Sequence, residues 1–365
     1  MAGAPPPTTW PHRRQDRRSR AGGRRLSNAD EAARSVLAIF GRPYLTGLLG
    51  EVARPGRERR EWHYWWQAHL ADCLLDAERR GSPEVRPGSA RKVLRGVWLR
   101  NRLRHRNSFY DDMAWLALAA LRMGRRVRSL DAALQRAITS GGAWWNTSRD
   151  YRNTAATGPI ALYLARTGRT RKAEDLLDWL LAELLHPATG LFQDGLRTVG
   201  AESVLVPDVY TYNQGPALGA MLELGRTDQA AALVHAVEEH LTRPEGRVLR
   251  THGGGDGGLF TGILTRYLAL AATDRRMPAA ARESAAGMVS ATADHLWGRR
   301  LERGWRGRAV VVFPAGTGPG DEPGEKVELS TQLQAWMALE AQAGQLAFTT
   351  KSLASSPVTS GSIRS

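Results

Sequence analysis

The chain has 365 residues, of which 42% are hydrophobic and 12 are Trp, so it can bury a large core as one big domain or as two. Its single cysteine, Cys73, excludes an internal disulfide and a cysteine-based metal site. The net charge of +15 does not establish a nucleic-acid-binding protein, because only four of the 51 basic residues are Lys and an Arg-, Ala-, Gly- and Pro-rich chain is typical of a GC-rich genome. We therefore expect no specific nucleic-acid partner.

Residues 1–27 are predicted to be a disordered basic segment. Within it, residues 1–25 contain seven Arg against one acid, Asp16, and are rich in Pro and Gly. No apolar stretch of the length of a signal peptide follows these arginines, and no run of about 20 apolar residues occurs anywhere in the chain. We expect no transmembrane segment and a cytoplasmic location, which becomes a secreted one if the natural start lies elsewhere.

Residues 28–345 are predicted to be one helical domain in which two kinds of helix alternate, with no alternating pattern that indicates a strand. Amphipathic helices with an Arg/Glu face suit an outer layer and are expected at 28–49, 89–105, 129–139, 170–185, 227–242 and 279–297. Helices that are apolar on nearly every side must be buried on every side and are expected at 61–80, 109–123, 151–166, 211–224, 258–271 and 327–344. The small, polar residues 346–365 are predicted to be a disordered tail.

Six outer and six inner helices in alternation predict an (α/α)6 barrel. The inner helices of such a barrel run parallel, with all their N-termini at one end. That end carries Trp, Tyr, Asn, Gln and Asp residues, which suit a sugar because its C–H faces stack on aromatic rings while its hydroxyls need hydrogen-bonding partners. We therefore predict the functional site at this mouth.

Two adjacent acids, Asp111 and Asp112, stand directly before one of the inner helical runs. Spacing alone favours a structural interpretation, because Asp is a preferred residue in the first turn of a helix. Neighbouring residues of a helix diverge by about 100°, so both acids can face one ligand only near the helix mouth. At the mouth of an aromatic sugar site, such a pair indicates glycoside hydrolysis.

The order and spacing of four motifs add to this interpretation. They are the acid pair before a helix containing Trp115, Trp144 and Trp145 before Asn153, Asp194-Gly-Leu before Tyr212-Asn-Gln-Gly, and Phe260-Thr-Gly-Ile before Arg266. Together, across roughly residues 30–345, they resemble glycoside hydrolase family 76, the α-1,6-mannanases and their bacterial relatives. In the family, Lys is often found where this chain has Arg152 and Thr261, so the contacts to the polymer are expected to differ.

This resemblance implies an (α/α)6 fold and a retaining double displacement in which Asp111 is the nucleophile and Asp112 the acid/base, about 5–5.5 Å apart. We expect several further residues to contact the substrate. The expected aromatic platform or wall comprises Trp65, Trp66, Trp115, Trp145, Phe192 and Phe260, and the expected partners of sugar hydroxyls are Asn153, Tyr212, Asn213 and Gln214. Asp194 and Asp256 stand in loops near the mouth, where they either bind sugar hydroxyls or cap turns.

The predicted function is hydrolysis of α-1,6-linked mannan or mannooligosaccharides by a monomer, and the chemistry requires no metal or organic cofactor. Two alternatives stay open. One is another sugar enzyme on the same barrel, of the N-acylglucosamine epimerase or unsaturated-uronide hydrolase type, although His63 is the main His near an inner N-terminus and an isomerase would need more. The other is a non-catalytic binder of glycans or anionic polymers, whose affinity would depend steeply on salt.

Overall fold

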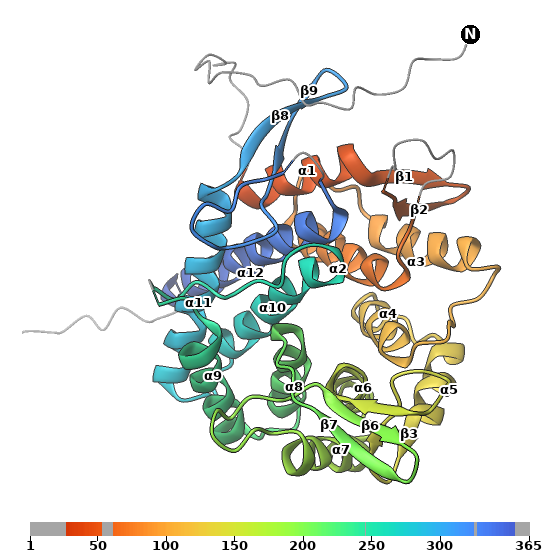
Figure 1. Ribbon diagram of the computed structural model, residues 1–365. Coiled ribbons are helices and arrows are strands. Elements are labelled where there is room, and N and C mark those ends of the chain that lie inside the picture. Colours follow the sequence, from red (N-terminus) through yellow and green to blue (C-terminus); the bar gives the residue numbers. More distant parts are fainter. Residues whose placement is uncertain (1–26, 53–60, 245, 325–326, 355–365) are drawn as a thin grey trace, which may run out of the picture.

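The computed structural model of the chain describes residues 27–52, 61–244, 246–324 and 327–354 (Figure 1). The predicted basic segment therefore lies outside the described residues except for Ser27, and so does the part of the predicted tail at 355–365. Ser27 is the N-cap of the first helix, where its side chain and that of Asp30 form a capping box.

The even-numbered helices are the ones that the sequence predicts to be buried, and each of them contacts the next one along the chain. In addition, α12 contacts α2, so the series of contacts closes on itself (Figure 1). The six helices are α2 (Tyr64–Arg80), α4 (Tyr110–Arg122), α6 (Thr154–Arg166), α8 (Thr211–Glu223), α10 (Phe260–Thr273) and α12 (Leu329–Ala354). The last of these is longer than the helix predicted at 327–344.

The odd-numbered helices lie outside them. They are α1 (Asn28–Phe40), α3 (Ser89–Arg100), α5 (Arg128–Ala137), α7 (Thr170–Glu183), α9 (Thr227–Leu241) and α11 (Ala279–Gly298). From α3 onward each packs on the even-numbered helix before it, and α1 packs on α12 (Figure 1). The prediction of a mainly helical domain with alternating buried and amphipathic helices is confirmed.

The prediction that the domain has no strands is wrong for the connections between the helices. The helix expected at 28–49 ends at Phe40, and a hairpin of β1 (Gly41–Tyr44) and β2 (Gly47–Gly50) follows. Pro43 cannot supply the N–H that a helix needs, and a Cβ on Gly47 would lie 2.5 Å from the Cα of Gly96. The close packing of this hairpin on α3 therefore depends on glycine.

Three further connections contain antiparallel strands. A small hairpin joins β3 (Ile138–Thr139) to β4 (Gly142–Ala143), and a longer one joins β8 (Leu301–Trp305) to β9 (Arg308–Val312). Between them in sequence, β5 (Tyr151–Asn153), β6 (Gly195–Val199) and β7 (Glu202–Val206) form one three-stranded sheet. This sheet stands where α6 begins, which places it at the end of the molecule where the sequence predicts the site.

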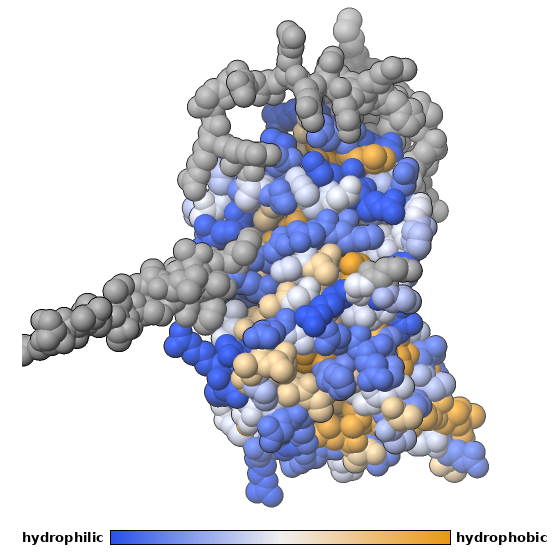
Figure 2. Space-filling view, turned by 90° about the vertical axis from the view of Figure 1, so that its left-hand side faces the viewer, coloured by the Kyte–Doolittle hydropathy of each residue, from blue (hydrophilic) through white to orange (hydrophobic). Residues whose placement is uncertain are grey.

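Hydrophilic residues predominate on the face shown in Figure 2, as expected for outer helices with one polar face. No helix in the described part of the chain is long and apolar enough to cross a membrane.

Candidate active site

Asp111 and Asp112 lie in the first turn of α4, and both are half-buried. The N-cap of this helix is Phe109, which makes no side-chain capping bond. Both carboxylates instead accept hydrogen bonds from other side chains. Each acid thus has a side-chain donor of its own in addition to its place at the helix start.

Asp111 is held by Trp145, whose Nε1 donates to Asp111 Oδ2 at 2.9 Å. The backbone places this indole, because the Tyr110 N–H donates to the Trp145 carbonyl and the Trp145 N–H donates to the Tyr151 carbonyl, each at 2.7 Å. The segment around Trp145 thus ties the start of α4 to β5. The other oxygen, Asp111 Oδ1, is buried and has no hydrogen-bond partner within the described part of the chain.

Asp112 is held by Asn107, whose Nδ2 donates to Asp112 Oδ2 at 2.5 Å. No motif in the sequence points to Asn107, which lies in the loop between α3 and α4. Both acids of the pair thus have one oxygen fixed by a side-chain donor.

The surroundings keep both acids from ionising easily. Burial raises the pKa of Asp111 to about 7, the charge of Asp194 adds to this, and Trp145 and the backbone N–H groups at the helix start lower it. Burial and the charge of Asp111, together with that of Asp256, raise the pKa of Asp112 well above its usual range, against the effect of Asn107. The pair can therefore hold one shared proton near neutral pH.

Asp194 stands next to this pair, just before β6. It accepts a hydrogen bond from the Tyr151 hydroxyl at 2.5 Å and one from Asn213 Nδ2 at 3.0 Å. Burial raises its pKa. Asp194 thus lies beside Asn213, and the contribution of Tyr151 was not anticipated from the sequence.

Aromatic side chains form the other side of the site. Trp65 and Trp66, at the start of α2, both donate their indole N–H groups to Asp256 Oδ1, at 2.9 and 2.8 Å. Tyr212 and Phe260 stack with ring centroids 4.0 Å apart, and Trp65 lies 6.3 Å from Phe260. Asp256 belongs to the 3-10 helix η1 (Gly255–Leu259), and its bonds to the two indoles orient both rings.

Four predicted contact residues are buried and have contacts within the fold. Gln214 and Phe192 are fully buried, and the Gln214 amide bonds the backbone N–H and C=O of Phe192. Asn153 is 2% exposed and its side chain caps α6 by accepting from the Ala156 N–H at 3.0 Å. Trp115 is 3% exposed and packs against the buried His69. Their contact with substrate stays a prediction, because amides and aromatics at a helix start serve the fold as readily as a ligand.

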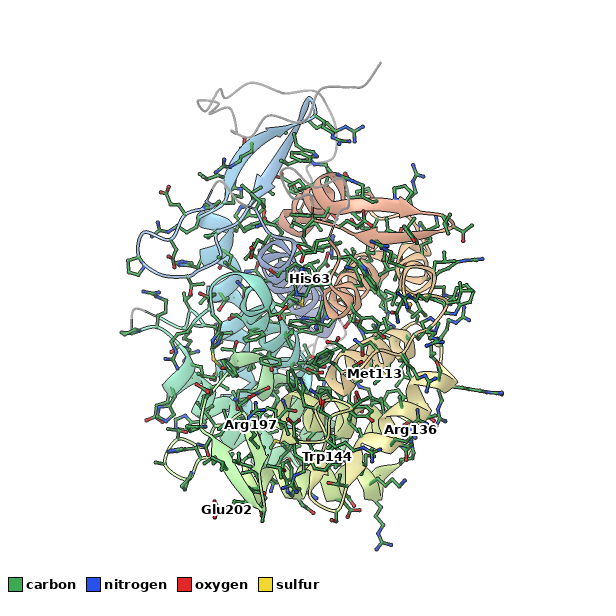
Figure 3. All side chains as sticks on the ribbon, turned by 45° about the vertical axis from the view of Figure 1, so that its right-hand side comes forward. His63, Met113, Arg136, Trp144, Arg197 and Glu202 are labelled. Carbon is green, nitrogen blue, oxygen red and sulfur yellow. The ribbon has the colours of Figure 1, made fainter. Side chains whose placement is uncertain are left out.

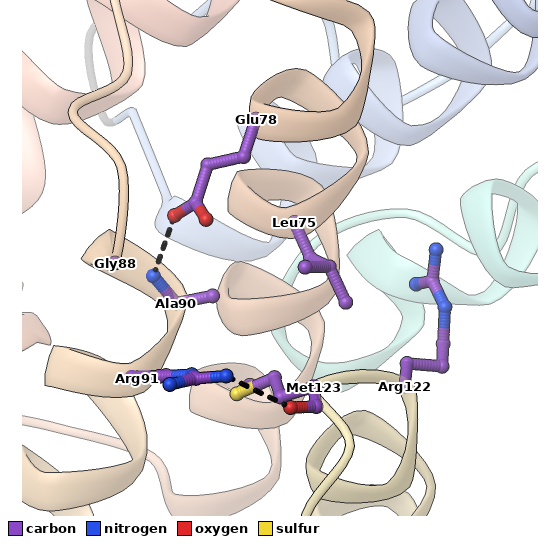
Figure 4. A pocket seen from close by; sticks show the side chains of 7 residues that line it. All are labelled: Leu75, Glu78, Gly88, Ala90, Arg91, Arg122 and Met123. Carbon is purple, nitrogen blue, oxygen red and sulfur yellow. Dashed lines mark hydrogen bonds between the residues drawn. The ribbon is translucent and has the colours of Figure 1, made fainter.

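The side chains at the other end of the inner helices are less suited to a functional site. A cavity of about 400 Å³ lies there between α2, α3 and α4 (Figure 4). Its acid, Glu78, accepts from the Ala90 N–H at 3.0 Å, and its Arg91 donates to the Met123 carbonyl at 3.3 Å. The third charged side chain of the cavity, Arg122, pairs with Asp72 and Asp76, so all three charged side chains already have partners. In Figure 3, His63 and Met113, from the starts of α2 and α4, lie toward the middle of the molecule, whereas Arg136 lies on the outer α5.

The chain matches the model of glycosyl hydrolase family 76 over residues 27–352. Among solved structures, the α-1,6-mannanase GH76A of Salegentibacter sp. HEL1_6 is 28% identical over 86% of this chain and 98% of that chain, with a TM-score of 0.75. An inactive variant of that mannanase, with two consecutive aspartates replaced by asparagine, was solved in complex with α-1,6-mannotriose and superposes with a TM-score of 0.74.

More distant structures share the fold. A protein of Listeria innocua is 23% identical over 88% of this chain and 97% of that chain, with a TM-score of 0.73. No curated protein matches the chain.

Proposed function

This chain belongs to glycosyl hydrolase family 76, and from that premise we propose that it cleaves α-1,6-mannosidic linkages by a retaining double displacement. One observation carries the proposal: two adjacent acids in the first turn of α4 each have one oxygen fixed by a side-chain donor, Trp145 or Asn107. The similarity to a mannanase that is inactive when two consecutive aspartates are replaced supports it.

In the proposed first step, Asp111 Oδ1 attacks the anomeric carbon while Asp112 gives its proton to the glycosidic oxygen as the C–O bond breaks. In the second step, Asp112 takes a proton from water, and the resulting hydroxide displaces Asp111 from the anomeric carbon. The difference between the two acids suits these roles. Asp111 has a buried oxygen without a partner among the described residues, and the pKa of Asp112 is raised well above its usual range.

We propose that Trp65, Tyr212 and Phe260 form the surface on which a mannose ring stacks. All three are partly exposed and come from helices whose N-termini lie at the same end. Asp194 and Asn213 are the proposed partners of sugar hydroxyls, because the buried Asn213 Oδ1 has no hydrogen-bond partner within the described residues. We also propose that the twelve helices form an (α/α)6 barrel, which the contacts from α2 round to α12 support.

The test is hydrolysis of α-1,6-, α-1,2- and α-1,3-linked mannooligosaccharides by the wild type, Asp111→Asn and Asp112→Asn. We expect turnover of the α-1,6 series and a loss of about a thousandfold or more in either variant. A matched control is Asp228→Asn, which changes an exposed first-turn Asp of α9 and should keep full activity. Cleavage of another linkage alone would contradict the proposed specificity. Equal mannan binding by all four proteins without turnover would indicate a binding protein.

A further inference from the structure

The loop before α4 presents one side chain, Asn107, directly to the acid pair. Its Nδ2 donates to Asp112 Oδ2 at 2.5 Å, and its Oδ1 accepts from the Phe109 backbone N–H at 3.0 Å. A backbone N–H can only donate, so it must face the oxygen of the Asn107 amide. These two bonds fix the Asn107 amide in one orientation, in which its NH2 group donates to Asp112.

The loop that carries Asn107 is itself fixed on both sides. Asn101 Nδ2 donates to the carbonyls of Arg104 and Arg106, at 3.0 and 2.9 Å. The Tyr64 hydroxyl donates to the carbonyl of His105, and the Thr147 N–H donates to the carbonyl of Ser108 at 3.0 Å. A donor on such a supported loop holds its partner in one orientation.

The groups around Asp112 give this bond a chemical role. Burial raises the pKa of Asp112, and the negative charges of Asp111 on the same helix and of Asp256 from η1 add to this effect. The Tyr64 hydroxyl from α2 is neutral, because burial raises its pKa. Asn107 lowers the pKa of Asp112, because its N–H donor stabilises the ionised carboxylate.

We infer that Asn107 is a positioning residue for Asp112, which fixes the transferable proton on Asp112 Oδ1 and stabilises the carboxylate left behind when that proton moves to the glycosidic oxygen. An N–H that donates to Oδ2 favours that atom as the carbonyl oxygen of the protonated acid, and so favours the proton on Oδ1. This inference rests on the proposed function and deepens it, because it acts only if Asp112 is the acid/base.

The test compares Asn107→Ala with the wild type on two substrates. An α-1,6-mannooligosaccharide has a sugar leaving group that needs a proton, whereas 2,4-dinitrophenyl α-mannoside has a leaving group that departs without one. We expect kcat/KM for the oligosaccharide to fall about 10- to 100-fold and kcat/KM for the aryl mannoside to change far less. We also expect the alkaline limb of the pH–rate profile to move to higher pH by about one unit, because Asp112 loses the donor that favours its ionised form.

Asn101→Ala is the matched control, since it loosens the same loop without touching Asp112. A purely structural role of Asn107 predicts that both substrates lose activity equally and that the pH limb stays in place, and this result would overturn the inference alone. Failure of the wild type to hydrolyse either substrate would instead overturn the proposed function and the inference with it.

Discussion

The two adjacent acids differ in what their oxygens can do. Trp145 occupies one oxygen of Asp111 and Asn107 one oxygen of Asp112, so the remaining oxygens are the ones that can react. Burial raises the pKa of both acids, so the stability of the folded state depends on pH. A carboxylate that resists ionisation in the folded state destabilises that state once the pH forces it to ionise.

The variant Asp111→Asn is expected to be more stable than the wild type, and more so at pH 8 than at pH 5. The folded-state pKa of Asp111 is raised from 3.8 to about 7, so stability is lost as the pH rises from the lower value to the higher one. Asn keeps an oxygen for the Trp145 indole and carries no charge. After allowance for partial solvent exposure we expect a gain on the order of 1–2 kcal/mol at pH 8, measured by urea unfolding at both pH values.

The control is again Asp228→Asn, for which we expect the same small change at both pH values because this side chain is exposed. An Asp111→Asn protein that is less stable than the wild type at pH 8 would show that Asp111 makes a net favourable contribution to the fold.

At the scale of single residues, the sequence predicted Asp111, Asp112 and Trp145 because they stand in recognisable motifs. It could not predict Asn107 or Tyr151, because their roles depend on loop and strand geometry that has no periodic signal. It also could not separate Gln214, which bonds only the backbone of buried segments, from Asn213, which bonds Asp194.

At the scale of elements, the same hydrogen-bonding arrangement recurs at the starts of three of the buried helices. The fourth residue of α2, α8 and α12 is Gln, and each side-chain amide bonds both the N–H and the C=O of one residue in the preceding connection. Gln67 bonds Gly50, Gln214 bonds Phe192 and Gln332 bonds Phe313, all at 2.8–3.0 Å. These amides complete the backbone hydrogen bonding of the connections against the helices.

The variant Gln214→Leu should destabilise the protein by about 2–4 kcal/mol, because it leaves the buried N–H and C=O of Phe192 without partners. Urea unfolding at neutral pH measures the effect. The matched control is Gln229→Leu on the outer α9, an exposed position where we expect a change of no more than about 0.5 kcal/mol. Similar stability of the two variants would show that the amide of Gln214 does not support the connection.

The amphipathic and all-apolar patterns predicted the positions of the helices well, because burial on one face or on all faces determines them. The hairpins were missed. β1 and β2 are four residues each, and β6 and β7 are largely exposed, so neither pair carries an apolar alternation that a sequence could reveal.

At the scale of the whole molecule, the order of helix contacts brings together groups that are far apart in sequence. Asp256 orients Trp65 and Trp66, and Arg266 pairs with Asp72 and Asp76, each across nearly 200 residues. The first of these contacts joins η1 to the start of α2, and no Arg or Lys is among the residues proposed to bind the sugar.

Binding of neutral α-1,6-mannan should therefore change less than about twofold between 50 and 300 mM NaCl. Uncharged hydroxyls and aromatic stacking do not release counterions, whereas an interaction through Arg side chains weakens steeply with salt. Isothermal titration of the Asp112→Asn variant, which we expect to be inactive, with an α-1,6-mannooligosaccharide gives the measurement. A steep loss of affinity with salt would favour a binder of anionic polymers.

The most direct test of the central claim is the configuration of the first product of α-1,6-mannotriose hydrolysis, followed by 1H NMR from the moment of mixing. The account predicts that the α anomer forms first and that the β anomer follows only by mutarotation, because Asp111 attacks the anomeric carbon and water then displaces it. Asp111→Asn should form no product on the same timescale. First formation of the β anomer would contradict the account, because it would mean that water attacks the sugar directly and that Asp111 is not the nucleophile.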